Sequence, residues 1–246
     1  MARLNRYVLK GLVVLLCMSF FSCGHLAPSH DQTADLQRHL EPIRVLNVLV
    51  ASDDSFEKAE IEHFIAETSE ELCDQVGVQL AVSEWVTVDW QHRQRPDVIH
   101  ELYRKTSEVV QAGQTDLVIG FMAPSAIELC GELVKSFVFL PVWEGLIDDT
   151  YRRFIVLKTL NESVLLHEIG HAFIWSHAHS SSGVMMGVAV KLLPFTPSLR
   201  SKKFSPGDVD EFLENKWRRF DEKVVLVGQD RPDALDEDAR VLTSNR

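Results

Sequence analysis

Cysteine is scarce in this 246-residue chain, and its four cysteines never form a C-x-x-C pair. A zinc site built from thiolates is therefore not supported, because such sites rely on closely spaced cysteine pairs. Cys17 and Cys23 lie near the amino terminus. Cys73 and Cys130 could form a disulfide in an exported protein, or they could be two buried thiols among apolar neighbours. The sequence leaves both readings open.

Long hydrophobic runs are also absent. Residues 11–21 are apolar apart from one serine, but this run is shorter than the roughly 20 residues that span a bilayer. Three basic residues precede it. A basic start followed by a short apolar run is typical of a secretory signal peptide, which we predict for residues 1–22. An uncleaved membrane anchor is the alternative.

The apolar run ends at Ser22-Cys23. This junction resembles a bacterial lipoprotein signal, in which a small residue precedes a cysteine that becomes the lipidated N-terminus. The resemblance makes Cys23 the lipidation candidate and implies membrane attachment in the bacterial cell envelope. With an ordinary cleaved signal, the protein would instead be secreted or periplasmic. Residues 23–42 are polar, contain two prolines, and are predicted to be a tether.

Basic residues are fewer than acidic residues in this chain. The chain has 25 basic and 36 acidic residues, for a formal net charge of −11. Removing residues 1–22 takes away three basic residues and no acidic ones, which lowers the net charge to −14. A surface of this charge disfavours nucleic acid and anionic membrane surfaces. We therefore predict no nucleic-acid partner.

Hydrophobic periodicity predicts an α+β domain over residues 43–220. Strands are predicted at residues 43–51, 78–90, 116–122, 137–142 and 154–158. Helices are predicted to begin near Phe56, Pro96, Asn161 and Ser205. The first should end at Gly77, and the last should reach about Phe220 with Trp217 on its apolar face. Residues 221–246 are rich in acidic residues and are predicted to be a loose tail.

The segment from His167 to His171 carries an HExxH pattern within a strongly helical stretch. Histidines four residues apart lie on one helix face, so their imidazoles can bind one metal ion. Glu168 points about 100° away around the helix. It can therefore act as a general base on metal-activated water without binding the metal. A single buried histidine is usually a core residue, but two at this spacing beside a glutamate are not easily explained by packing.

A third histidine would complete the metal site. His177 follows His171 by six residues, and a continued helix would place it about 240° around the axis. The helix must therefore break between them if His177 is to bind. His179 is a further candidate, more typical of a solvent-facing residue. A continued helix would place His179 about 12 Å along the axis from His171, too far to share an ion. If the helix instead breaks at Trp175-Ser176, fewer residues are needed to bring His177 back to the ion than to bring His179 back.

With His177 included, the string resembles the HExxHxxGxxH motif of the metzincin clan of zinc proteases. Met185 follows eight residues later, which resembles the Met-turn spacing of the matrixin branch. Residues 204–209 resemble the start of the matrixin C-terminal helix. Ile174 replaces the glycine of the clan, and Met186-Gly187 stands where matrixins usually have tyrosine and proline.

The resemblance implies a twisted, mixed five-stranded sheet with two packing helices, an active-site helix, a Met-turn and a C-terminal helix. It also implies one catalytic Zn²⁺ held by His167, His171 and His177. The implied activity is that of a zinc endopeptidase with Glu168 as general base. Its peptide or protein substrate would lie extended along an edge strand, expected at residues 116–122 or 137–142.

Two other functions remain open. The chain could be a non-catalytic zinc-binding lipoprotein that binds a partner, although the intact Glu168 argues against this because a pure binder needs no base there. It could also be a hydrolase of small amides rather than peptides.

Overall fold

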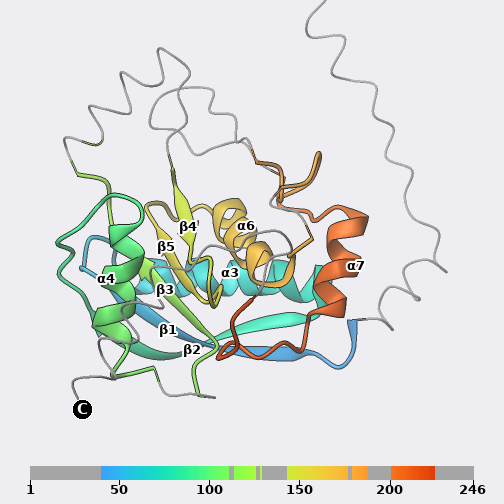
Figure 1. The fold of residues 1–246 in the computed structure, drawn as a ribbon, viewed down its shortest axis with the longest axis horizontal. Helices are drawn as coiled ribbons and strands as arrows, with labels where there is room; N and C mark the ends of the chain where they lie inside the picture. The colour runs from blue at the N-terminus through green and yellow to red at the C-terminus, as the bar shows by residue number, and fades with distance from the viewer. Residues whose placement is uncertain are drawn as a thin grey trace, which may run out of the picture. The chain divides into compact units, whose positions relative to one another are not determined.

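The computed structural model describes residues 40–110, 114–125, 128, 143–176, 179–187 and 201–224 (Figure 1). The elements follow in the order β1 (Arg44–Ser52), α3 (Lys58–Val76), β2 (Val78–Thr87), α4 (Asp97–Thr106), β3 (Leu117–Phe121), β4 (Gly145–Ile147), β5 (Phe154–Leu157), α6 (Glu162–Phe173) and α7 (Pro206–Glu214). None of the helices in these ranges is long and apolar enough to cross a membrane. The predicted α+β class is confirmed.

The five strands form one mixed sheet in the order β2-β1-β3-β5-β4. Neighbouring strands are parallel except for β4, which pairs antiparallel with β5. The predicted mixed five-stranded sheet is confirmed, but the expectation that residues 116–122 form an edge is wrong. β3 lies between β1 and β5, and all five of its residues are buried, as expected for an interior parallel strand.

The edge strand beside β5 is β4, which the sequence did not predict. It has only three residues, and the first of them is glycine. So short a strand shows no alternation of apolar and polar residues, and glycine disfavours strands. The strand predicted at residues 137–142 lies outside the described residues.

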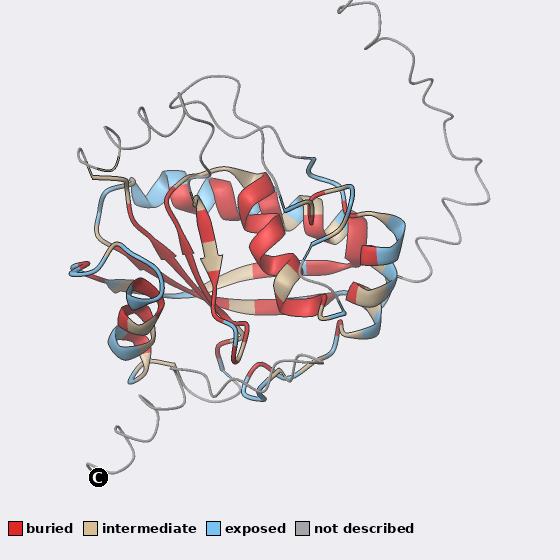
Figure 2. Cartoon of the chain, turned by 45° about the horizontal axis from the view of Figure 1, so that its top comes forward, coloured by how far each residue is buried: buried red, intermediate tan, exposed pale blue. Residues whose placement is uncertain are grey.

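Helices cover both faces of the sheet. Successive residues of β1 point to opposite faces: Leu46 and Val48 pack in one apolar cluster with α3, α6 and α7, whereas Leu49 and Ala51 pack in a second cluster with α4. Figure 2 shows the buried strands and the largely buried α6, with exposed outer surfaces on α3 and α4. This arrangement places α6 against the interior of the domain.

The predicted end of α3 agrees with the structure, whereas the predicted end of α7 does not. α3 ends at Gly77, which has a φ of 63° and lies so close to the Leu40 carbonyl oxygen that an added Cβ would be 2.2 Å from it. α7 ends at Glu214, earlier than predicted. Trp217 therefore lies beyond the helix and is 57% exposed, so its predicted place on an apolar helix face is wrong. Phe212 and Phe220 are buried as expected.

Candidate metal centre

The candidate metal site is built on α6. This helix begins at Asn161, whose side chain accepts a hydrogen bond from the Ser163 N–H at 3.1 Å, as the sequence predicted. Ten of its twelve residues are buried, including the polar side chains Ser163, His167 and Glu168. Burial of such groups is costly unless each is held by partners or by a ligand.

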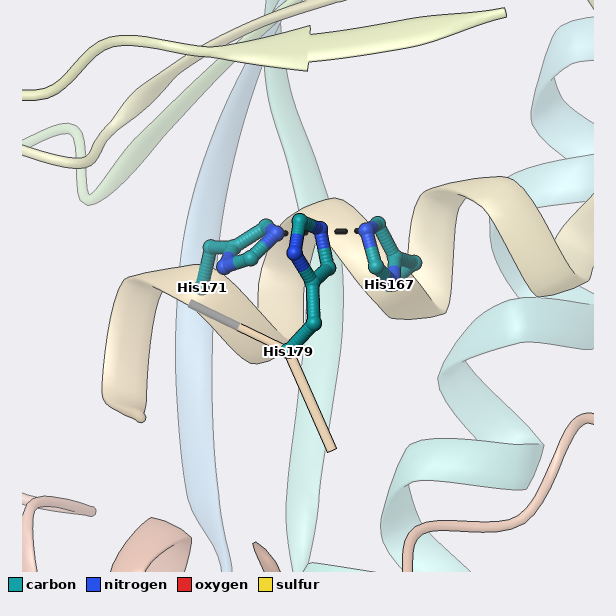
Figure 3. Close-up of side chains that lie close together, drawn as sticks. All are labelled: His167, His171 and His179. Carbon is teal, nitrogen blue, oxygen red and sulfur yellow. Dashed lines mark hydrogen bonds between the residues drawn. The ribbon is translucent and has the colours of Figure 1, made fainter. Parts of the chain in front are cut away.

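Three histidines converge at this helix (Figure 3). His167, His171 and His179 each bring one ring nitrogen within 4.8 Å of the other two. The Nε2 atoms of His167 and His171 are 3.2 Å apart. A tetrahedral ion that binds each nitrogen at about 2.0–2.1 Å needs ligand atoms roughly 3.4 Å apart. The His167–His171 pair has this spacing, and His179 lies close enough to make the three, which we call the histidine cluster, a candidate site for one ion.

The tautomer of His167 is defined by its surroundings. Its Nδ1 atom lies 2.9 Å from the carbonyl oxygen of Val184. A carbonyl oxygen only accepts hydrogen bonds, so Nδ1 carries the proton and Nε2 is left as the metal-binding atom. Fixing a histidine ligand through its second nitrogen is the usual arrangement at metal sites.

The third histidine of the cluster is His179, whereas the sequence favoured His177. His177 lies outside the described residues, so its role as a ligand stays a prediction. The chain leaves the helix after Phe173, and Ile174 has an extended backbone with φ −107° and ψ 113°. A β-branched residue favours this conformation, which removes the need for glycine. The axial separation that counted against His179 applies only to a continued helix.

Carboxylates on α7 hold both ends of the segment that carries His179. We call residues 175–180 the return segment. At its start, Glu211 accepts hydrogen bonds from the backbone N–H groups of Trp175 and Ser176, the latter at 2.7 Å. At its end, the Ser180 hydroxyl donates to Asp208. The direction of the chain after α6 is thus determined by a helix more than thirty residues later.

Side chains from outside the helix, Trp175 among them, donate to the last carbonyls of α6. Arg152 donates to the carbonyls of His171 and Ile174 at 2.7 and 2.9 Å. Arg218 donates to that of Ala172, and Asn215 to that of Phe173, each at 2.8 Å. Burial lowers the pKa of Arg218 to about 10, which leaves it charged at neutral pH. Cations at a helix C-terminus are favourable, so these contacts stabilise the helix that carries His171.

Met185 packs beneath the helix. It is fully buried, and a Cβ added to Gly170 would lie 2.2 Å from its sulfur atom. The Ser180 N–H donates to the Met185 carbonyl at 3.0 Å. Gly187 has a related role, because a Cβ there would lie 2.8 Å from the His179 ring. The Met186-Gly187 departure noted in the sequence therefore leaves room for His179.

Glu168 faces the edge strand. A Cβ added to Gly145 would lie 2.6 Å from Glu168 Oε1, so the β4 backbone packs directly over this carboxylate. Arg95 donates to the Gly145 carbonyl at 2.7 Å. The sequence analysis missed Gly145 and Arg95. A glycine in a strand could have signalled a close backbone approach, but β4 itself was not recognised.

Comparisons with known proteins concern the fold. No protein-family model matches the chain, and no curated protein matches it. The structure is similar to that of archaemetzincin from Methanopyrus kandleri, with a TM-score of 0.47 and 15% identity over 78% of this chain and 100% of that chain. It is also similar to metalloproteinase-II from Bacteroides fragilis, with a TM-score of 0.40 and 13% identity over 70% of this chain and 53% of that chain. The predicted matrixin-like branch stays a prediction.

The chain's own residues therefore define the site. A five-stranded α+β fold presents a histidine cluster on its central helix, with a buried glutamate between two of the histidines and a short edge strand over that glutamate. Three imidazoles suit zinc and related divalent ions. The arrangement is that of a candidate mononuclear metal centre with an adjacent acid–base group.

Proposed function

We propose that this chain is a zinc-dependent endopeptidase, with Glu168 as its general base. The observation that carries the proposal is the convergence of three histidine nitrogens within 4.8 Å beside that buried carboxylate. His167, His171 and His179 would hold one zinc ion. Three neutral imidazoles from the protein leave a coordination position open, which distinguishes catalytic sites from closed structural ones.

A zinc ion bound there supplies Lewis-acid chemistry, because it lowers the pKa of water and polarises a carbonyl group. Glu168 would take a proton from the attacking water and pass it to the leaving amine. Its position one residue after His167 keeps it out of the ligand set. The Gly145 backbone packs against this carboxylate with no room for a side chain between them.

The edge strand supports an extended peptide as substrate. On either side of β4, Glu144 and Asp148 form hydrogen bonds toward β5 and the residue after it, through Lys158 N to Glu144 O and Asp148 N to Phe154 O. Backbone groups alternate in an antiparallel strand, so those of Gly145 and Ile147 point away from β5. The Gly145 carbonyl already accepts from Arg95, so a peptide could pair by strand addition with the remaining edge groups, which would bring its backbone beside Glu168.

The rival function is a zinc-binding lipoprotein without catalysis. Such a protein gains nothing from a carboxylate kept 93% buried next to the ligands, where its desolvation is costly. A hydrolase of small amides would use the same site chemistry. A digest of casein and of a peptide library, with zinc and with a chelator, separates the three functions. Cleavage that needs zinc supports the proposal, cleavage of small amides alone supports the third function, and no cleavage supports the binder.

Metal content provides an independent test. Elemental analysis of protein purified without added metal is expected to find about one zinc per chain, because the described residues hold one such histidine cluster. Protein that contains no transition metal and takes up none on zinc titration would contradict the proposal.

We also propose that the protein is attached to the cell envelope through a lipidated Cys23, which lies outside the described residues. The support is the Ser22-Cys23 junction after an apolar run. Labelled palmitate should be incorporated by the natural chain in a bacterial host and lost in Cys23→Ala. Equal labelling of both would end this proposal.

A further inference from the structure

A second cavity, of about 480 Å³, lies where the start of β1 meets the chain that follows α7. None of its lining residues belongs to the histidine cluster. The charged ones are Arg44, Arg153, Arg218, Arg219, Asp116 and Asp221. Four arginines against two aspartates give this cavity a net positive charge, although the whole chain carries −11. We call it the arginine pocket.

The two aspartates already have partners. Asp221 pairs with Arg219 at 2.7 Å, and Asp116 lies 3.4 Å from Arg44. Among the described residues, Arg153 and Arg218 form no ion pair with a carboxylate. They donate instead to backbone carbonyls, those of Phe220 and Tyr151 among them. Their positive charge is offset only without direct pairing, by Asp148, Asp116 and Asp221 for Arg153 and by Asp148 for Arg218.

Burial makes this imbalance costly. Arg153 is 6% exposed, and its Nε atom is buried without a hydrogen-bond partner. The pKa of Arg218 falls to about 10, mainly through burial, and the charges of Arg44 and Arg153 contribute to the fall. Buried charges are normally paired. An anion in the pocket would add negative charge close to these guanidiniums, and guanidinium groups bind carboxylates with charge-assisted hydrogen bonds.

The rim of the pocket is apolar. Ile43, Val45 and Trp217 are 40%, 52% and 57% exposed, and they are the large apolar residues that the described part of the chain exposes. All three line this one cavity. A gathering of exposed apolar side chains is characteristic of a binding site rather than of a random surface.

We propose that the arginine pocket binds a small organic carboxylate with an apolar body. The carboxylate would pair with Arg153 and Arg218, and the apolar body would pack against Val45 and Trp217. A free fatty acid and the C-terminal residue of a peptide both have this chemistry. Arg218 also donates to the Ala172 carbonyl of α6, so the ligand would contact a residue that caps the metal-bearing helix.

Titration calorimetry of the full chain, without zinc, tests the pocket independently of peptidase activity. The probes are octanoate and N-acetylleucine, each compared with its neutral amide. Binding of octanoate alone would identify a fatty-acid site, and binding of N-acetylleucine would identify a peptide C-terminus. We expect the amides to bind at least about tenfold more weakly than the acids, and the acids to lose affinity as salt is raised. Equal affinity for acids and amides, or no binding of any probe, would overturn the proposal.

A pair of variants locates the site. Replacing the buried Arg153 risks unfolding, so the change is made at the exposed rim with Val45→Asp. The control is Thr87→Asp, an exposed position at the opposite end of the neighbouring strand, since Thr87 pairs with Ser52 and the strands start at Arg44 and Val78. A like charge at the rim should weaken binding of the acid probe about tenfold, and the control should leave it unchanged. Undiminished binding in Val45→Asp, with an unchanged melting temperature, would place the ligand elsewhere and refute the pocket.

Discussion

The two sides of the histidine cluster are built by different physical means. His167 and His171 are one turn apart on α6, so helix geometry alone brings their Nε2 atoms to 3.2 Å. His179 reaches the same point from a segment outside any helix, whose path depends on carboxylates of α7 and on the space over Gly187. The difference shows that local periodicity determines a pair of ligands, whereas tertiary contacts choose the ligand that completes the site.

The largest effect is expected on the helix side, from Glu168→Gln. This change keeps all three histidines and removes only the proton acceptor, so zinc content should be unchanged while kcat falls about 10²–10⁴-fold. Peptide hydrolysis and elemental analysis on the same preparation measure both quantities. Near-normal turnover would assign the base to another residue.

The sharpest test of the return side compares His179→Ala with His177→Ala. Loss of one of three ligands should weaken zinc binding more than about 100-fold, so we expect that result for His179→Ala and little change for His177→Ala. Competition with a chromophoric chelator measures the affinity. The opposite order would restore the ligand predicted from the sequence, and would show that the return segment brings His177 rather than His179 to the ion.

Gly145→Ala tests the close approach of β4 to the helix side. An added methyl group would contact the Glu168 carboxylate, and displacing a catalytic group by about 1 Å can cost on the order of 100-fold in rate. We expect kcat to fall about 10–100-fold with zinc affinity unchanged. Gly207→Ala is the matched control, because an added Cβ at Gly207 has no neighbour within 4 Å. Equal kcat values in the two variants would show that the close approach of Gly145 to Glu168 does not affect catalysis.

The smallest effect is expected from Glu211→Gln, which weakens the hold of α7 on the return segment. The amide keeps one acceptor oxygen but loses the charge that strengthens bonds from Trp175 and Ser176. Zinc affinity should fall about tenfold, as for other groups that orient ligands. Glu214→Gln changes an exposed residue of the same helix and should have no effect. A similar loss of zinc affinity in both variants would show that the negative charge of α7 matters, rather than the hydrogen bonds of Glu211 to Trp175 and Ser176.

The parts of the fold that follow a regular period were predictable from the sequence. Continuous apolar runs located β1, β3 and β5, and the Asn161 cap with its HExxH pattern located α6. Glu168 could be placed beside the metal because adjacent residues on a helix diverge by about 100°. In each case the pattern lies within one short continuous stretch of the chain.

What could not be predicted depends on residues far apart in the chain. The edge position of β4 requires the whole sheet order, and a strand of three residues shows no period. The place of His179 depends on Glu211 and Asp208, which follow it by about thirty residues. Ile174 suggested a difficult turn only because glycine was expected there, and an extended backbone with side-chain partners avoids the difficulty.

The residues that form the histidine cluster all come from the chain after residue 143, whereas β1, α3 and β2 form a parallel βαβ arrangement earlier in the sequence. A bound ion therefore adds its binding free energy first to the opening of α6, the return segment and α7. Because α6 shares one apolar cluster with β1 and α3, opening of these elements would also expose apolar residues of β1 and α3. Metal occupancy is thus expected to slow the opening of this shared core as well as that of α6 and the return segment.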